Sequence, residues 1–386
     1  MPGGLGLRKL HGAGRIIAFV VLMSALLLAG CASRGVVNPG WTVVSADGEM
    51  VYTVLATGKV AALDAASGAE RWNYPVATAS SGGLGSLFSR PDPNQETALN
   101  AVYGAPVFSD ELVFVGTFDN KLVAFNRSSG QRAWEYTTEG AIIGGATEYD
   151  GVVYFGASDS RVYAVKPTAS GPQLLWNPIV TGHGVWGAPA VNDRYVFVAS
   201  LDHHVYAIDK DSGALVWDHD MGAAVPGGVT IAGDLLLVGG IAKKLSALNA
   251  ETGSLVWEHA FEQWVWGEAV AANGTAYVST LDGKVHGVSL KDGAIKWSTQ
   301  LEGALRAGPT LAGEYLVIGS QSGRVYRVEL SGGKADLLYV LDKTNILAPV
   351  AVLDGRAYIG TTAASVIALD ISKVGGSPLW TYPVAN

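Results

Sequence analysis

The chain has 386 residues, of which 50 are glycine, 11 are tryptophan and only 16% are charged, with a formal net charge of −8. Such an apolar, aromatic and turn-rich composition excludes a disordered chain or a coiled coil, and the acidic balance argues against a protein that binds the phosphate backbone of nucleic acid. The single cysteine excludes an internal disulfide and a cysteine-cluster metal site.

The first thirty residues have the pattern of an export signal. Basic residues Arg8, Lys9 and Arg15 precede an apolar run over 16–29. This run is shorter than the ~20 residues needed to cross a bilayer. A basic start, a short apolar run and small residues at its end predict a secretory signal peptide over residues 1–30.

Residues 28–31 are Leu-Ala-Gly-Cys, which resembles the lipobox of bacterial lipoproteins. The resemblance implies that Cys31 is lipidated and becomes the new N-terminus, with residues 31–40 as a short tether to a membrane. The alternative is an ordinary signal peptide with a cysteine by chance. Ala32 stands where an Asp would resemble an inner-membrane retention signal, so the sequence favours the outer membrane if the host has one.

A unit of about 41 residues is repeated eight times along the rest of the chain, which is typical of repeat architectures. Its clearest copy, ALDAASGAERW at 62–72, ends in tryptophan, and gaps between copies are regular except for one near residues 77–100. The closing aromatic residues of the eight copies are Trp72, Trp134, Trp176, Trp217, Trp257, Trp297, Tyr339 and Trp380.

Each unit contains four short strand signals separated by turn residues. In the fourth unit these are APAVND, RYVFVAS, HVYAID and LVWDHD. Hairpin dipeptides recur at Asp47-Gly48, Asp150-Gly151, Asn273-Gly274 and Asp354-Gly355. A single four-stranded sheet cannot bury both of its apolar faces, whereas a ring of sheets can. We therefore expect an all-β fold, an eight-bladed β-propeller of four-stranded antiparallel blades, as one domain over residues 41–386.

The end of each unit has a structural interpretation. Glycine precedes tryptophan by four residues in six units, where it permits the turn into the outer strand. The tryptophan is then expected to pack its flat surface on the neighbouring blade. The residues predicted to dock blades in this way are Trp72, Trp134, Trp176, Trp217, Trp257, Trp297 and Trp380.

The A-x-D/N-x-x-S/T-G-x-x-x-W unit resembles the tryptophan-docking repeat of quinoprotein-type (PQQ-like) propellers, over essentially the whole mature chain. With the lipobox, it looks like the BamB family of lipoproteins in the outer-membrane β-barrel assembly machinery. The resemblance implies a monomeric, non-catalytic scaffold that faces the periplasm. Its implied partners are envelope proteins, among them a BamA-type barrel and associated lipoproteins, with no cofactor and no nucleic acid.

Two other classes of function stay open beside this one. The chain could be the scaffold of another envelope complex, or a PQQ-like propeller that binds a small ligand as a sensor. Quinoprotein dehydrogenases resemble the repeat too, but they place PQQ under a disulfide of adjacent cysteines. A chain with one cysteine and no C-x-x-C-H haem motif does not fit them, so we expect no enzyme.

Aligned units place larger residues at one position beside the inner strands, next to small residues that let these strands crowd around the axis. The position is expected to ring the channel mouth, where aromatic residues with one arginine suit recognition of a peptide or ligand. The alternative is a solvated rim of polar turns. The candidate interaction residues are Tyr103, Trp186, Trp266 and Arg306, with Asp119, Asp202 and Asp282 on nearby turns. Ile143, Pro226 and Leu347 are their equivalents in other units.

Two further features have both a functional and a structural interpretation. His183, Asp202, His203 and His204 could approach one another and hold a metal, but adjacent histidines of a strand point to opposite sides, so surface histidines and no metal are expected. The 77–100 insertion carries apolar residues in a Gly/Ser-rich stretch and is either a partner-docking segment or a plain surface loop. Its candidate docking residues are Leu84, Leu87 and Phe88.

Overall fold

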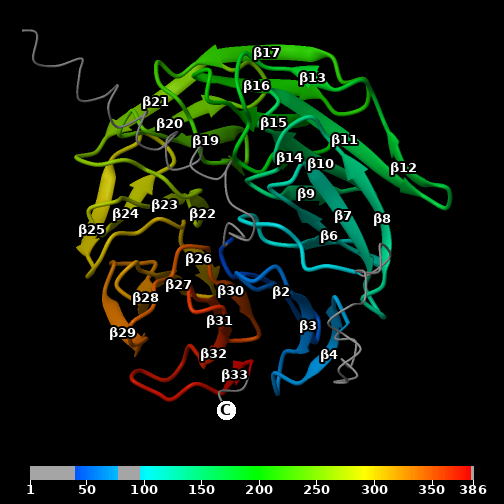
Figure 1. Cartoon of the computed structure of the whole chain (residues 1–386). Helices are drawn as coiled ribbons and strands as arrows, with labels where there is room; N and C mark the ends of the chain where they lie inside the picture. Colours follow the sequence, from blue (N-terminus) through cyan, green and yellow to red (C-terminus); the bar gives the residue numbers. More distant parts are fainter. Residues whose placement is uncertain (1–39, 77–95, 384–386) are drawn as a thin grey trace, which may run out of the picture. The chain divides into compact units, whose positions relative to one another are not determined.

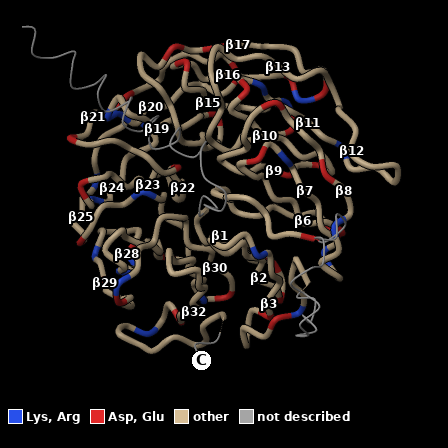
Figure 2. The backbone as a smooth tube through the Cα atoms, in the orientation of Figure 1, with Lys and Arg blue, Asp and Glu red and all other residues tan. Residues whose placement is uncertain are grey.

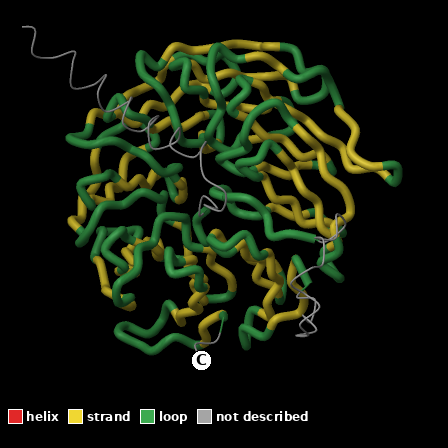
Figure 3. The backbone as a smooth tube through the Cα atoms, in the orientation of Figure 1, coloured by secondary structure: helices red, strands yellow, loops and turns green. Residues whose placement is uncertain are grey.

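Eight small β-sheets stand side by side around a common axis (Figure 1). The computed structural model describes residues 40–76 and 96–383, and in these ranges it contains strands and loops but no helix (Figure 3). Consequently, none of the described segments is a helix that could cross a bilayer. Every sheet has four antiparallel strands, with one extra strand in the third, so the predicted eight-bladed β-propeller is confirmed.

Each blade is formed by consecutive strands. The strands of blades 1 to 4 are β1 (Val43–Asp47), β2 (Met50–Val54), β3 (Val60–Asp64), β4 (Glu70–Tyr74); β5 (Val107–Phe108), β6 (Leu112–Gly116), β7 (Lys121–Asn126), β8 (Arg132–Thr137); β9 (Ala146–Tyr149), β10 (Val152–Ala157), β11 (Arg161–Thr168), β12 (Gly171–Leu174), β13 (Ile179–Val180); β14 (Ala190–Val191), β15 (Tyr195–Ala199), β16 (His204–Asp209) and β17 (Leu215–Asp220).

The second half repeats the same order. The strands of blades 5 to 8 are β18 (Val229–Ala232), β19 (Leu235–Gly239), β20 (Lys244–Asn249), β21 (Leu255–Ala260); β22 (Val270–Ala272), β23 (Thr275–Ser279), β24 (Lys284–Ser289), β25 (Ile295–Gln300); β26 (Thr310–Ala312), β27 (Tyr315–Gly319), β28 (Arg324–Glu329), β29 (Ala335–Val340); β30 (Ala351–Leu353), β31 (Arg356–Gly360), β32 (Val366–Asp370) and β33 (Trp380–Tyr382).

Burial follows strand position within a blade. The second strand is covered on both faces, as in β15, where all five residues are buried. The fourth strand is the outer edge and alternates exposed and half-buried residues, as in β17. Charged residues accordingly lie mainly toward the outside of the ring and on the turns (Figure 2). The first strands of neighbouring blades contact one another around the axis, so the apolar core consists of the layers between blades.

The hairpins between first and second strands follow the expected turn chemistry in three of the four dipeptides. Asp150 and Gly151 have φ of 53° and 74°, which is the pattern of a type I′ turn. The Asn273-Gly274 and Asp354-Gly355 turns have the same signs. In blade 1 the turn lies one residue later, because Asp47 pairs with Met50 and only Gly48 has a positive φ.

The closing tryptophans bridge neighbouring blades. Trp217 of blade 4 donates its indole N–H to the carbonyl of Ala250 in blade 5 at 3.2 Å. Gly253 in the same turn has a φ of 70°, and a Cβ there would lie 2.6 Å from the Trp217 ring. The turn therefore needs glycine both for its conformation and for the close approach of the indole. The same N–H bond joins Trp72 to Arg127, Trp176 to Lys210, Trp257 to Leu290, Trp297 to Leu330 and Trp380 to Ala65.

Two blades depart from the regular unit. In blade 3, β11 runs on to Thr168 and pairs with β12, so the turn that faces Trp134 differs from its counterparts, while Trp134 keeps its contact with Phe114 at 5.7 Å. In blade 7 the register shift between β28 and β29 lies between Val325 and Tyr326, nearer the start of the third strand than in blades 4 to 6. As a result, Leu338 is fully buried and Tyr339, the closing aromatic residue in the sequence pattern, is only half-buried.

The ring closes between blades 8 and 1 without a shared strand. β1 contacts β30 and β31, and the N–H of Trp380 and the hydroxyl of Tyr358 both donate to the carbonyl of Ala65 at 3.1 Å. The hydroxyl of Tyr382 also bonds to the carboxylate of Glu70. This seam therefore uses the same side-chain contacts as the other junctions, but no continuous chain crosses it.

Candidate functional site

One face of the ring carries the inter-blade loops together with the turns between second and third strands. We call it the mouth face. Backbone hydrogen bonds tie the two kinds of segment together: Leu281 N donates to the carbonyl of Trp264 at 3.2 Å, and Leu201 N donates to that of Gly184 at 3.0 Å. Because each turn is held by the loop that enters its own blade, the side chains of this face are carried on a fixed frame.

The turns of the mouth face share one backbone requirement. The third residue of every such turn lies in the left-handed region, although only three of the eight blades use glycine there. His203 and Lys243, with φ of 82° and 61°, therefore occupy positions set by the turn. The eight residues are Gly58, Asn120, Ser160, His203, Lys243, Gly283, Gly323 and Ala364.

The predicted mouth residues form separate groups. The guanidinium of Arg306 lies 5.8 Å from the ring centroid of Trp266, which stacks on Trp264 at 6.0 Å. Tyr103 belongs to another cluster, with edge contacts to Trp41 at 5.3 Å and Phe118 at 6.0 Å. The structure thus brings Trp266 and Arg306 into a cation–π contact and places Tyr103 in a different aromatic group.

Trp186 is half-buried beside the inner strand of blade 4. Its backbone carbonyl faces Gly144 of the preceding blade so closely that a Cβ on Gly144 would lie 2.0 Å from it. The equivalents in other blades, Ile143, Pro226 and Leu347, are half-buried as well. Part of each of these side chains is therefore open to solvent on the mouth face.

The acidic turn residues differ in their surroundings. Asp119 is exposed, whereas Asp202 accepts bonds from the Tyr206 hydroxyl at 2.7 Å and the His204 backbone N–H at 2.9 Å. Partial burial acts to raise the pKa of Asp202, but these hydrogen bonds outweigh it and hold the pKa below its usual value. Asp282 accepts from the Thr280 hydroxyl at 2.5 Å. Asp119 is thus the most exposed of the three carboxylates, whereas Asp202 is already used within its turn.

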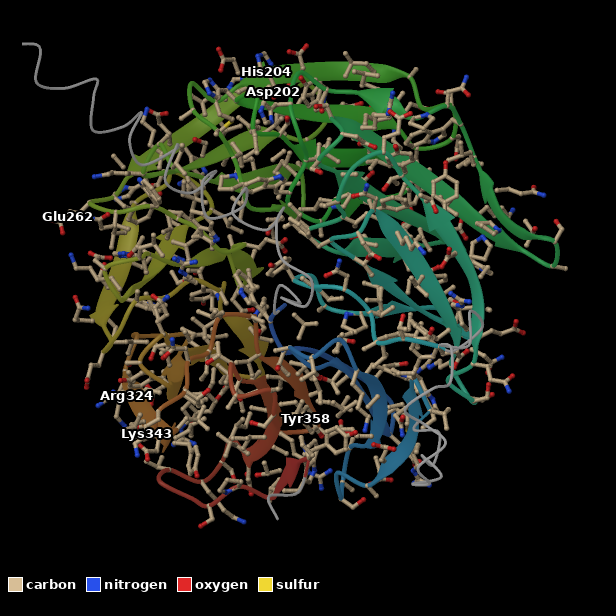
Figure 4. All side chains as sticks on the ribbon, viewed as in Figure 1. Asp202, His204, Glu262, Arg324, Lys343 and Tyr358 are labelled. Carbon is tan, nitrogen blue, oxygen red and sulfur yellow. The ribbon has the colours of Figure 1, made fainter. Side chains whose placement is uncertain are left out.

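The histidines of blade 4 are not gathered into one site. The ring of His183 accepts from the Gly184 N–H at 2.8 Å, while His204 pairs with Asp218 of the outer strand at 2.7 Å (Figure 4 labels Asp202 and His204). Within residues 40–76 and 96–383, no group of three or more His, Cys, Asp or Glu side chains is arranged to hold a metal ion.

A carboxylate beside the axis was not singled out by the sequence pattern. Glu268 stands where the equivalent residues of the neighbouring blades are Gly228 and Gly308. Its Oε1 lies over Gly228, where a Cβ would approach it to 2.1 Å. Although solvent-accessible, Glu268 is surrounded by the inner strands, and this burial raises its pKa to about 7. The only sequence signal was an acid inside the small-residue stretch Gly267-Glu268-Ala269.

A pocket lies between blades 5 and 6, and the sequence did not predict it. It has a volume of about 370 Å³ and opens near Glu262 (labelled in Figure 4) at the edge of the mouth face. The end of β21 and the following loop form one wall, and β24 and β25 form the other. His259 of β21 lines it. Its main polar and aromatic lining residues are His259, Phe261, Glu262, Asp282, Lys284 and His286.

Several predicted residues lie outside the described ranges. These are the lipidation candidate Cys31 with the leader before it, and the candidate docking residues of the insertion, Leu84, Leu87 and Phe88. They keep the status of predictions.

Comparison with known sequences shows a family match. A family model described as outer membrane protein assembly factor BamB matches residues 31–167 and 201–346. The assembly factor BamB of Moranella endobia is 26% identical over 212 residues, which are 51% of this chain and 48% of the relative. That of Pseudomonas aeruginosa is 30% identical over 172 residues, 44% and 40% of the two chains. The chain thus matches about half or less of the length of these relatives.

Solved structures show the same fold. The computationally designed protein Ika8 superposes with a TM-score of 0.71 at 17% identity, over 86% of this chain and 97% of the design. BamB from Moraxella catarrhalis superposes with a TM-score of 0.59 at 21% identity, over 73% of this chain and 82% of that one. Because the family model covers well over half of the sequence, the chain belongs to the family of outer membrane protein assembly factor BamB.

Proposed function

We propose that the chain is a non-catalytic scaffold in the assembly and insertion of outer-membrane β-barrel proteins. The observation that carries the proposal is the family match over residues 31–167 and 201–346. The relatives are named assembly factors, a name that specifies no reaction. A rigid ring whose loops are fixed by backbone hydrogen bonds suits a scaffold, since binding costs less when a surface is already ordered.

The proposal includes an envelope location. The leader over residues 1–30 would direct export, and lipid on Cys31 would hold the propeller near the periplasmic face of the outer membrane through the tether at 31–40. The basic start, the short apolar run and the Leu-Ala-Gly-Cys ending support this. Incorporation of labelled fatty acid into the wild type but not into Cys31→Ser is the expected result.

The proposed partner surface is the mouth face, and the proposed partners are a BamA-type barrel and its associated lipoproteins. Half-buried aromatic residues with a nearby arginine are the usual anchors of protein interfaces, and the Trp266–Arg306 contact provides such a pair. The other proposed contact residues are Tyr103, Trp186, Asp119, Asp202 and Asp282.

Cross-linking in intact cells of the native host, followed by affinity purification and mass spectrometry, tests this function. We expect recovery of a BamA-type barrel with partner lipoproteins, and a clear loss of both in a Trp266→Ala/Arg306→Ala double variant. The matched control is Leu215→Ala/Val216→Ala, which removes side chains exposed by 52% and 44% on the outer strand of blade 4 and should leave recovery unchanged.

The assembly proposal would be contradicted if no barrel-assembly protein were recovered in an experiment in which a known envelope complex is recovered intact. Equal loss in both double variants would instead place the interaction surface elsewhere on the ring.

A further inference from the structure

One position of the repeat, the third residue of the third strand, differs from blade to blade. The third residue of the third strand is Tyr163 in blade 3 and Tyr206 in blade 4, and each hydroxyl bonds to the aspartate of its own turn, Asp159 or Asp202, at 2.7 Å. In blade 6 this residue is His286. A shorter side chain therefore stands where blades 3 and 4 place a tyrosine that spans to the turn.

His286 bonds inward and does not reach the turn aspartate. Its Nδ1 lies 2.7 Å from the Ser298 hydroxyl and its Nε2 lies 3.4 Å from the Thr280 hydroxyl. The side chain is only 7% exposed. The space that a tyrosine fills in blades 3 and 4 is not filled by His286, and the pocket of about 370 Å³ is found there.

Blade 6 also lacks the outer-strand glutamate that forms an ion pair with a lysine in two other blades. In blades 2 and 5 the first residue of the third strand, Lys121 or Lys244, pairs with a glutamate of the outer strand, Glu135 at 3.0 Å or Glu258 at 2.8 Å. The equivalent outer-strand residue in blade 6 is Ser298. Lys284 consequently has no acid across from it on β25.

Lys284 turns instead to the pocket rim. Its ammonium lies 2.7 Å from Glu262 and 3.2 Å from Asp282. Burial lowers the pKa of His286 to about 4, so that ring is neutral at pH 7. One ammonium therefore faces two carboxylates, and the pocket carries a surplus negative charge. Phe261 adds an aromatic wall, with its ring 4.7 Å from that of His286.

We propose that this pocket binds a guanidinium or ammonium group, held by the carboxylates of Asp282 and Glu262 beside the Phe261 ring. A planar guanidinium offers several donors to carboxylates and also favours an aromatic neighbour. The volume suits a group of side-chain size. The pocket shares only Asp282 with the contact residues of the assembly proposal, and the binding of a cation there does not depend on that proposal.

NMR titration of the propeller labelled at its histidine rings tests the site. The probe is N-acetyl-argininamide, with the neutral isostere N-acetyl-citrullinamide as the comparison ligand. We expect a saturable shift of the His259 signal, assigned with a His259→Gln variant, and a binding constant at least tenfold weaker for the citrulline compound. Absence of a saturable shift with the arginine compound, or equal binding of the two, overturns the proposal.

Variants that copy the residues of other blades keep the fold and test the geometry. His286→Tyr places in blade 6 the residue that blades 3 and 4 already carry, and it should abolish the His259 shift. Glu262→Gln with Asp282→Asn should weaken binding at least tenfold. Glu302→Gln is the matched control, because Glu302 holds the same loop position in blade 7 and pairs with Arg324 at 2.9 Å. Unchanged binding in His286→Tyr would overturn the assignment.

The cation could come from a free amine or from the side chain of a protein. A capped Gly-Arg-Gly peptide separates these sources. Binding as tight as that of the small compound identifies a side chain within a chain as a sufficient ligand. Binding of the small compound alone identifies a free amine, and both results support the pocket.

Discussion

At the scale of single residues, the glycines of the docking turns meet two requirements. One is a left-handed backbone conformation, and the other is room for an indole ring. Gly130 has a φ of 71°, and a Cβ there would lie 2.4 Å from the Trp72 ring. Gly151 has a similar φ of 74° but no atom within 4 Å of such a Cβ. Conformation is thus the only constraint on Gly151, whereas Gly130 must also leave room for the indole.

We therefore expect Gly151→Ala to lower the free energy of unfolding by about 1 kcal/mol, the usual cost of a left-handed alanine. Gly130→Ala should lower it by about 2–4 kcal/mol, because it also crowds a packed junction. Denaturant unfolding of the two variants measures the difference. Equal losses would show that the Trp72 indole moves aside without cost.

Glu268 predicts a pH dependence of stability. Its pKa in the folded chain, about 7, is above the ordinary value of 4.5, so the fold favours the protonated acid. Its contribution is therefore favourable at low pH and is lost as the pH rises from 4.5 through 7. Since Glu268 is solvent-accessible, water screening keeps the effect near ~1 kcal/mol.

The variant Glu268→Gln should be more stable than the wild type above pH 7 and equal to it below pH 4.5. Thermal unfolding across this range measures the gap. Glu302→Gln, which removes a carboxylate on an exposed loop, serves as the matched control. A constant gap between Glu268→Gln and the wild type would contradict the titration.

At the scale of elements, the insertion at 77–100 is the feature whose role the sequence left open. If it only docks a partner, deletion of residues 80–96 should leave the strand content and cooperative unfolding unchanged, because β4 ends at Tyr74 and β5 begins at Val107. Circular dichroism and thermal unfolding check this. Loss of the folded state would remove the docking hypothesis, since the segment would then be part of the core.

The blades were predictable because burial imposes the same alternation and turn residues on every unit. The exceptions come from local changes that are not visible in the repeat pattern of the sequence. In blade 7, a displaced bulge in the outer strand buries Leu338 in place of Tyr339. In blade 8, the left-handed turn glycine is Gly375 and not Gly376, the residue four before the tryptophan.

The candidate sites were less predictable, because they depend on contacts between blades. The sequence located Trp266 and Arg306 on one face, but their contact at 5.8 Å needs the packing of blade 6 on blade 7. The pocket beside His286 depends on how Glu262, Asp282 and Lys284 are placed around a side chain that is smaller than the tyrosine of blades 3 and 4. A smaller side chain that leaves space unfilled produces no motif that could be recognised in the sequence.

At the scale of the whole molecule, the seam between blades 8 and 1 is the one junction without a connecting chain. Trp380 there makes the same contact that Trp217 makes between blades 4 and 5. Truncating either tryptophan to alanine should cost about 3–5 kcal/mol. Only at the seam, however, can the two blades separate while the rest of the ring stays folded.

Hydrogen exchange should consequently accelerate in β1 and in β30 to β33 of the Trp380→Ala variant, ahead of global unfolding. The Trp217→Ala variant should show no such local opening, because blades 4 and 5 remain joined by their loop. Matching exchange patterns in the two variants would show that the chain connection contributes nothing to holding neighbouring blades together.

Each blade is one uninterrupted stretch of chain, and the ring closes by side chains alone. The present ends thus interrupt no sheet, and neither would new ends in any other inter-blade loop. Circular permutants cut between blades, with the old ends linked across the seam, are expected to keep all eight sheets. By the same reasoning, a duplicated or deleted blade needs no compensating strand at the opposite terminus, which leaves the number of blades open to change by whole-unit recombination.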